Sequence, residues 1–298
     1  MSSLVSHSWR WTIGECAARQ QMQKGNLVLQ SRKVLQTRTY WLKYLLALTV
    51  LSALSEKVAA DELRITTSRG ASVEVIADYP SGSGPFAAVI LAPGQGYHMA
   101  APLLVQAAQQ FTARGIAVYR FNWAFYSKDP KEGRPAPDFS TEFEDMTAVL
   151  NRARGDARID RARIIAAGKS IGSVVAWKVF SENKDLKAGL FLTPLCSRWQ
   201  KETNVFTPRV ENNYPGIAEE KRPISFVFGD QDVAFCSPSI LYRHAAQAGG
   251  AARVAVLAGD HSFADPILKG PEGEAAMLKN VGRAADLSAD FVDTALQR

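Results

Sequence analysis

The sequence predicts an α/β fold in which a mostly parallel, eight-stranded sheet has helices on both faces. From residue 61 onward, short apolar runs alternate with segments of helical period, which is typical of a parallel sheet covered on both sides. One of these runs, 164–167, leads into the pattern Gly-x-Ser-x-Gly at Gly168, Ser170 and Gly172, and an apolar helical segment follows. This strand-turn-helix context is what the pattern requires.

The first 60 residues differ from the rest of the chain. Residues 44–54 are continuously apolar, but the run is shorter than the roughly 20 residues that cross a bilayer. Basic residues precede this apolar run, and Val58, Ala59 and Ala60 follow it, with small residues at the positions that a signal peptidase recognises. This pattern predicts a secretory signal peptide cleaved after Ala60, and therefore a periplasmic or secreted protein. An uncleaved membrane anchor is the alternative, and Met22 is an alternative start because the region before the apolar run is long.

The excess positive charge lies in this N-terminal segment. The chain has 35 Lys and Arg against 29 Asp and Glu, a formal net charge of +6, and residues 1–60 hold eight of the basic and two of the acidic residues. Residues 61–298 therefore carry 27 charges of each sign. This balance shows no excess of positive charge that would indicate nucleic-acid binding. We expect 61–298 to be one well-buried domain with no nucleic-acid partner and no stable membrane insertion, and the oligomeric state stays open.

The predicted elements follow in chain order. An entry hairpin pairs 63–67 with 73–78, and buried strands are predicted at 87–91, 116–121, 164–167, 189–195, 224–228 and 254–257. Helical periods cover 103–111, 139–150, 239–248 and 274–296. Two polar, Pro-rich insertions interrupt the alternation at 127–138 and 197–223, and the second has room for a helix and a turn.

Ser170 is the candidate nucleophile. In so tight a strand-to-helix turn the serine takes a strained backbone conformation and presents its hydroxyl at a helix N-terminus, where the dipole favours developing negative charge. Gly168 and Gly172 are expected because a side chain there would collide with a neighbouring strand or helix. The alternative is a glycine-rich turn with an incidental serine.

A nucleophilic serine needs a base, and residues 61–298 contain three histidines. His261 follows the last predicted strand, in the position where sites of open α/β sheets form, so we assign it as the base. His98 lies in the loop after 87–91, and His244 lies within a helical segment and is expected to be inert.

The acid should also follow a strand, and both Asp230 and Asp232 follow 224–228. Asp232 lies farther along the loop and can reach a neighbouring histidine, so we favour it. Asp230 is expected to bond the backbone amides of its own turn. The order Ser170, Asp232, His261 is that of α/β-hydrolases and differs from the orders in chymotrypsin and subtilisin.

With these residues in place, the chain from about residue 61 to its C-terminus resembles the α/β-hydrolases, and most closely their dienelactone-hydrolase-like branch. The matching motifs lie at 168–172, 229–232 and 259–263. Dienelactone hydrolases proper use cysteine where this chain has Ser170. The resemblance implies an oxyanion loop at 91–96, with one backbone donor at Ile171 and the other at Gln95 or Gly96. That loop begins Pro93-Gly94 here, where His-Gly is common.

Other side chains near these loops have alternative readings. Trp123, Phe125 and Tyr126 follow the strand 116–121 and are candidates for the wall of an acyl pocket, although aromatic residues at a strand end serve equally as packing. Lys169 is expected to point at solvent, with a contribution to an acidic substrate as the alternative.

The cysteines and the absence of cofactor motifs in the sequence limit the kinds of chemistry to expect. Cys196 and Cys236 each follow a predicted strand, and an exported protein could pair them; two buried free thiols are the alternative. No metal-ligand spacing, dinucleotide fingerprint or phosphate loop is present, so we expect no cofactor and no metal.

The hypothesis from sequence is a serine hydrolase that cleaves a small to medium carboxylic ester or related acyl compound through an acyl-enzyme. A thioesterase or peptidase on the same fold, and a non-catalytic binding module, are the alternatives. Because 197–223 is short, we expect no large lid over the site.

Overall fold

The computed structural model describes residues 59–248 and 252–298. All but the last two residues of the predicted signal peptide, 1–58, lie outside the described residues. The described part belongs to one compact unit, Val58–Arg298. Its first strand, β1 (Ala59–Thr66), includes Ala59 and Ala60, so the predicted cleavage point lies inside this strand.

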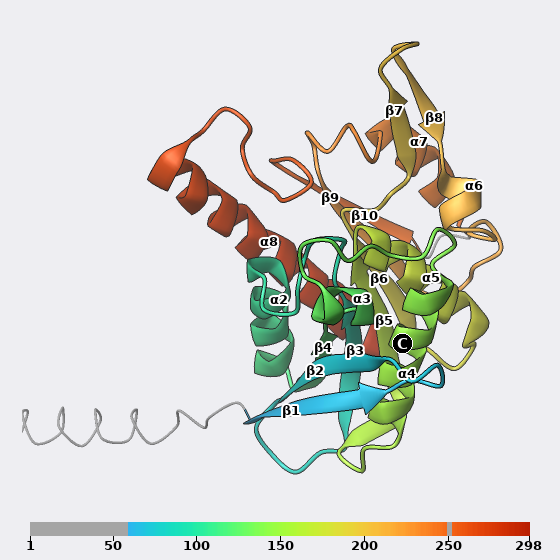
Figure 1. The fold of residues 1–298 in the computed structure, drawn as a ribbon, viewed down its shortest axis with the longest axis vertical. Helices are drawn as coiled ribbons and strands as arrows, with labels where there is room; N and C mark the ends of the chain where they lie inside the picture. Colours follow the sequence, from blue (N-terminus) through green and yellow to red (C-terminus); the bar gives the residue numbers. More distant parts are fainter. Residues whose placement is uncertain (1–58, 249–251) are drawn as a thin grey trace, which may run out of the picture. The chain divides into compact units, whose positions relative to one another are not determined.

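Eight strands form one sheet in the order β1-β2-β4-β3-β5-β6-β9-β10 (Figure 1). The strands after β1 are β2 (Ser72–Tyr79), β3 (Phe86–Ala92), β4 (Ile116–Phe121), β5 (Ile159–Lys169), β6 (Ala188–Leu192), β9 (Ile224–Gly229) and β10 (Ala252–Leu257). β2 runs antiparallel to both of its neighbours, and all pairs from β4 to β10 are parallel. The mostly parallel, eight-stranded sheet predicted from sequence is confirmed.

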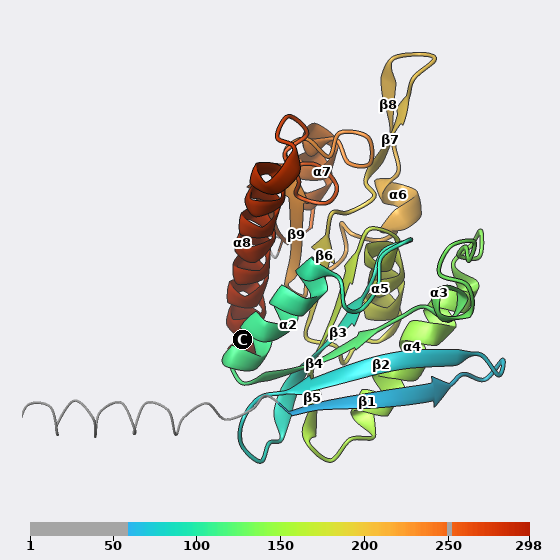
Figure 2. The same ribbon diagram turned by 60° about the vertical axis from the view of Figure 1, so that its left-hand side comes forward.

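Helices cover both faces of the sheet (Figures 1 and 2). The helices are α2 (Pro102–Ala113), α3 (Ala124–Lys128), α4 (Ser140–Arg154), α5 (Ile171–Glu182), α6 (Val210–Asn213), α7 (Pro238–Ala245) and α8 (Gly270–Leu296). Along β3, Val89 and Leu91 pack into a core with α2 and α8, whereas Ala88 and Ile90 pack into a second core with α4 and α5. Burial on both faces explains why the central strands are continuously apolar.

Several strands differ from their predicted bounds: β1, for example, begins at Ala59 and not at residue 63. The strand predicted at 189–195 ends at Leu192, because Thr193 adopts a φ of 40° and Pro194 has no N–H for a ladder. β5 begins at Ile159, before the predicted 164–167. Its first half was not predicted because it is largely exposed and carries no apolar run.

The insertion 197–223 does not form the expected helix and turn. It contains a hairpin of β7 (Ser197–Gln200) and β8 (Val205–Pro208), followed by the single-turn helix α6. Asn204, with a φ of 54°, closes the turn of the hairpin. Figure 2 shows the hairpin extending away from the main sheet. Each strand of this hairpin has only four residues, too few to show an alternating pattern, so the hairpin was not predicted. No helix in the described part has both the length and the apolar character needed to cross a membrane.

Candidate active site

Ser170, Asp232 and His261 lie at the carboxyl ends of β5, β9 and β10. These strands run parallel with β6 between the first two, so their carboxyl ends meet at one edge of the sheet. Sites in open α/β sheets form in this position. The structure thus brings together three residues that are 29 or more positions apart in the chain.

The turn at Ser170 has the strained geometry expected from sequence. Its φ of 55° and ψ of −121° lie in a region that L-residues rarely adopt. The Ser170 N–H bonds the Leu192 carbonyl at 3.0 Å, and the Ser173 N–H bonds the Ser170 carbonyl at 2.9 Å. A Cβ on Gly168 would lie 2.1 Å from the Gly172 carbonyl oxygen, and a Cβ on Gly172 would lie 2.5 Å from the Pro93 carbonyl oxygen, so both positions require glycine.

The three side chains form a continuous hydrogen-bonded chain. His261 Nε2 lies 2.9 Å from Ser170 Oγ, and His261 Nδ1 lies 2.8 Å from Asp232 Oδ2. The Asp232 side chain is fully buried, and its Oδ1 has no hydrogen-bond partner among the described residues. Burial raises the pKa of Asp232, while the bond to His261 and the nearby positive charge of Lys169 oppose that rise.

Backbone bonds hold the acid loop against the histidine loop. Asp230 Oδ1 accepts a bond from the Gly259 N–H at 3.0 Å, and the Gln231 N–H bonds the Gly259 carbonyl at 2.9 Å. Asp230 therefore bonds the neighbouring loop rather than its own turn. Asp260 Oδ1 accepts bonds from the N–H groups of Ser262 and Ala264, which shapes the turn around His261. Asp230 and Asp260 thus fix the loops, and Asp232 alone faces the imidazole.

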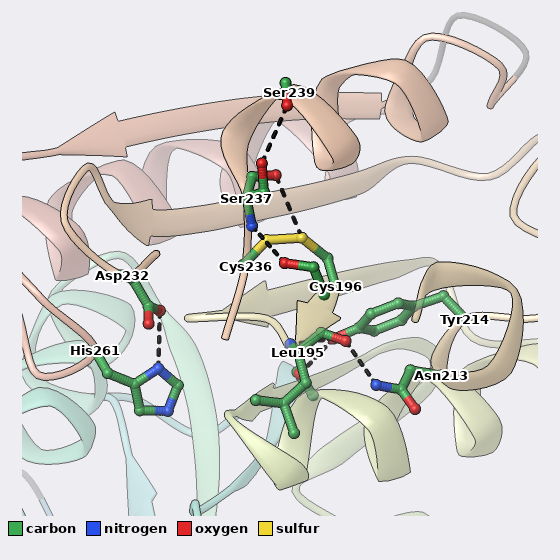
Figure 3. Close-up of a disulfide and its surroundings, with 11 residues drawn as sticks. Leu195, Cys196, Asn213, Tyr214, Asp232, Cys236, Ser237, Ser239 and His261 are labelled. Atoms are coloured by element: carbon green, nitrogen blue, oxygen red, sulfur yellow. Dashed lines mark hydrogen bonds and ion pairs between the residues drawn. A yellow bond between two sulfur atoms is a disulfide. The ribbon is translucent and has the colours of Figure 1, made fainter. Parts of the chain in front are cut away.

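A disulfide joins Cys196 to Cys236, as Figure 3 shows beside Asp232 and His261. The Cys236 N–H bonds the Asp232 carbonyl at 3.0 Å, and the Ser197 N–H bonds the Phe235 carbonyl at the same distance. The disulfide therefore attaches the loop of the acid to the start of the β7–β8 hairpin.

A cavity of about 540 Å³ opens over the serine. Ser170 and His261 line it together with the three oxyanion candidates Gln95, Gly96 and Ile171. Its other walls are Tyr126, Leu195 and Phe235, and its rim comes from the insertion after α3, with Pro130, Lys131, Gly133 and Arg134. The hydrogen-bonded chain thus opens onto a space that can hold a small molecule.

Only one of the three predicted wall residues lines this cavity. Tyr126 does, but the interpretation of Trp123 was wrong: it is fully buried, and its Nε1 donates to the Pro93 carbonyl at 3.0 Å. Its ring packs edge-on against Phe121, so the indole supports the loop that contains Pro93. Phe125 is partly buried against the core and does not line the cavity.

Sequence reasoning missed Phe235. Its side chain is 46 % exposed, and its ring centroid lies 4.4 Å from that of His261, so it forms a wall directly beside the imidazole. An aromatic residue between the candidate acid Asp232 and Cys236 was the available signal. Leu195 and the cationic rim residues Lys131 and Arg134 were also missed, because nothing in their local sequence marks them.

Lys169 does not point at solvent. Its side chain is buried, with a residue exposure of 3 %, and its Nζ donates to the main-chain carbonyl of His261 at 3.1 Å. Burial lowers the pKa of Lys169 to about 8. The β5 strand ends directly beneath the histidine loop, and this placement could not be read from the sequence.

The other two histidines take no part in the hydrogen-bonded chain. His244 Nδ1 lies 3.5 Å from Glu211 Oε1 on α6. His98 stacks on Tyr126 with ring centroids 5.9 Å apart. Within residues 59–248 and 252–298, no cluster of three or more His, Cys, Asp or Glu side chains is arranged to hold a metal ion.

The chain matches an α/β-hydrolase domain over residues 85–293. No curated protein matches it. Among solved structures, a dienelactone hydrolase from Anabaena variabilis is similar with a TM-score of 0.61 at 12% identity, covering 80% of this chain and 99% of that chain. An α/β serine hydrolase homologue from Coxiella burnetii has a TM-score of 0.56 at 19% identity, covering 78% and 98%.

A third similar structure is a Xanthomonas campestris protein described as an α/β serine hydrolase without a lid. Its TM-score is 0.53 at 18% identity, and the match covers 76% of this chain and 93% of that chain. At these identities the structural matches show a common fold. The match to the domain family spans most of the chain, and the chain therefore belongs to the α/β-hydrolase family.

Proposed function

We propose that this protein is a serine hydrolase that cleaves small to medium carboxylic esters, with Ser170 as nucleophile, His261 as general base and Asp232 as the acid that orients it. The observation that carries the proposal is the unbroken chain from Asp232 through His261 to Ser170, with distances of 2.8 and 2.9 Å, at a strained strand-to-helix turn.

In the proposed mechanism, His261 Nε2 takes the proton of Ser170 Oγ while Oγ attacks the ester carbonyl carbon. The imidazolium then gives this proton to the leaving alcohol, and the acyl group stays on Oγ. Water, deprotonated by the same nitrogen, attacks the acyl-enzyme and releases the carboxylic acid. Asp232 accepts the Nδ1–H bond, which fixes the imidazole tautomer and stabilises the imidazolium.

Backbone N–H groups would bind the oxyanion. Ile171 begins α5, so its N–H has no partner within the helix and lies at the positive end of the helix dipole. The second donor comes from Gln95 or Gly96, on the loop that Trp123 supports. One donor of this kind lowers the barrier by about 3 kcal/mol.

The cavity favours a compact substrate. Its volume of about 540 Å³ is in the range of small-molecule sites. The chain between β6 and β9 forms a narrow hairpin and one helical turn, which do not make a hydrophobic cover for a long acyl chain.

The direct test is steady-state hydrolysis of p-nitrophenyl acetate by the wild type and Ser170→Ala. We expect Ser170→Ala to lose at least about a thousandfold in kcat while the melting temperature is retained. Ser181→Ala, which removes a hydroxyl from the far end of α5, is the matched control. Equal activity of wild type and Ser170→Ala would reject Ser170 as nucleophile, and no turnover of any acyl substrate by the wild type would favour a non-catalytic binding module.

We also propose that the protein is exported and that its mature N-terminus is Asp61. The leader pattern supports this, and so does the Cys196–Cys236 disulfide, because disulfides persist in oxidising compartments. Cleavage after Ala60 would remove only the two pairs that Ala59 and Ala60 make with β2. Mass spectrometry of the native protein tests this, and an intact N-terminal segment would favour an uncleaved anchor.

A further inference from the structure

Lys169 is a buried cation that the mechanism above does not use. It is the last residue of β5 and immediately precedes Ser170. Its Nζ lies 4.8 Å from the centroid of the Tyr97 ring and donates to the His261 carbonyl. In the described part of the chain, no carboxylate oxygen lies within 4 Å of this ammonium, although Asp232 and Asp260 act on it electrostatically.

Such burial is unfavourable for stability. An ammonium removed from water without a contacting carboxylate loses hydration that one carbonyl bond and one aromatic ring only partly replace. A methionine would fill the same space without this penalty. A stabilising role therefore does not account for Lys169.

The hydrogen bond from Lys169 Nζ to the His261 carbonyl connects Lys169 directly to the candidate base. The histidine loop is held through Gly259, Asp260 and Phe263, whose bonds lie on either side of His261. Among the described residues, the ammonium makes the side-chain bond that reaches the main chain of His261 itself. It fixes the peptide that carries the imidazole, and a displacement of about 1 Å there can reduce turnover about a hundredfold.

The charge of Lys169 acts on the same group of residues. The groups that face the ammonium are Tyr97 on the β3–α2 loop, Asp232 on the β9–α7 loop, and Asp260 and His261 on the β10–α8 loop. A nearby cation favours the ionised form of a buried carboxylate and disfavours a second cation. The charge of Lys169 therefore opposes the rise that burial causes in the pKa of Asp232, and it favours the carboxylate form that accepts the His261 Nδ1–H bond.

We propose that Lys169 is a positioning residue of this active site: its ammonium anchors the main chain of His261 and places a positive charge beside the Asp232–His261 pair that activates Ser170. This inference rests on the proposed function. It assigns a task to the residue before the nucleophile.

The test compares the wild type with Lys169→Met, using Lys187→Met as the matched control because Lys187 is exposed at the start of β6. We expect Lys169→Met to lower kcat about tenfold to a hundredfold with KM changed less than about twofold. Because loss of a cation raises the pKa of neighbouring groups, the acid limb of the kcat/KM profile should move up by about half a pH unit or more. The melting temperature should stay or rise.

Wild-type kinetics together with a wild-type pH profile in Lys169→Met would overturn the inference. So would a lower kcat with a lower melting temperature and an unmoved acid limb, because that combination indicates a structural role. If Lys169→Met does not fold, the wild type alone decides: kcat/KM should fall as the pH rises through about 8, where the ammonium loses its charge, and a plateau extending to pH 10 would contradict it.

The two failures can be told apart. If the wild type hydrolyses esters through Ser170 and Lys169→Met behaves like Lys187→Met, the proposed function stands and this inference falls. If the wild type has no hydrolytic activity, the proposed function falls and takes the inference with it.

Discussion

Buried charged residues lie at both ends of β5, and the two ends differ in how completely these charges are paired. Before the strand begins, Asp156 accepts bonds from the hydroxyls of Tyr79 and Tyr119 and from Arg158, so both of its oxygens are used. Arg158 also bonds the Asp61 carboxylate at 2.7 Å. Where the strand ends, no described residue places a carboxylate in contact with Lys169, and none bonds the second carboxylate oxygen of Asp232.

The pKa directions follow this difference. The bonds from Arg158 and the tyrosines hold the pKa of Asp156 far below its usual value, so its charge is fixed. At the other end, burial lowers the pKa of Lys169 to about 8 and raises that of Asp232. The charge of Asp156 is thus fully paired, whereas at the candidate site burial shifts the pKa values of Lys169 and Asp232 toward their neutral forms, a pattern that is common at functional sites.

The largest expected effect separates the two aspartates of the acid loop. Asp232→Asn should reduce kcat about ten-thousandfold, because an amide favours the wrong imidazole tautomer. Asp230→Asn should change kcat less than about tenfold, since the Asp230 carboxylate bonds the Gly259 N–H and not the imidazole. Steady-state kinetics of the two variants decide it, and the reverse ranking would assign the acid to Asp230.

Removing the disulfide should have the next largest effect, this time on stability. The bond spans 40 positions, and in the chain-entropy model replacing both Cys196 and Cys236 by alanine lowers the free energy of unfolding by about 4 kcal/mol. Because the bond anchors the loop of Asp232, kcat should fall as well. Denaturant unfolding with a kinetic assay measures both, and unchanged stability would contradict the predicted anchoring.

At the other end of β5, Asp156→Asn should lower the free energy of unfolding by about 2 kcal/mol without lowering kcat. The pKa of Asp156 is depressed in the folded state, so its contribution is present above the unfolded pKa of about 3.9 and is lost as the pH falls below it. Acid unfolding of Asp156→Asn should thus depend less on pH than that of the wild type. A matching loss of kcat would break the division between the two ends.

The smallest expected effect concerns acyl length. Rates on p-nitrophenyl esters should be highest at C2 or C4 and about tenfold lower at C16, because the open cavity buries little of a long chain. A maximum at C16, or a jump in rate above the solubility limit, would indicate a cover formed by the β7–β8 hairpin.

Sequence patterns sufficed where local chemistry and chain position coincide. The turn at Ser170 needs its glycines, and apolar runs mark strands buried on both faces, so the sheet and the order of Ser170, Asp232 and His261 were predictable. Side-chain direction was not. Trp123 turns into the core and Lys169 turns under the histidine loop, and both depend on contacts with residues far away in the chain. The hairpin at β7 and β8 was missed because each of its strands has only four residues, too few to show a period.

The central claim is that Ser170 is an activated nucleophile. The most direct measurement is treatment of the protein with a fluorophosphonate, followed by mass spectrometry of its peptides, beside His261→Ala and Ser170→Ala. We expect a single adduct on Ser170 in the wild type, slower labelling in His261→Ala and none at this peptide in Ser170→Ala. An unlabelled Ser170 in a folded wild-type protein, or an adduct on another residue, would contradict it.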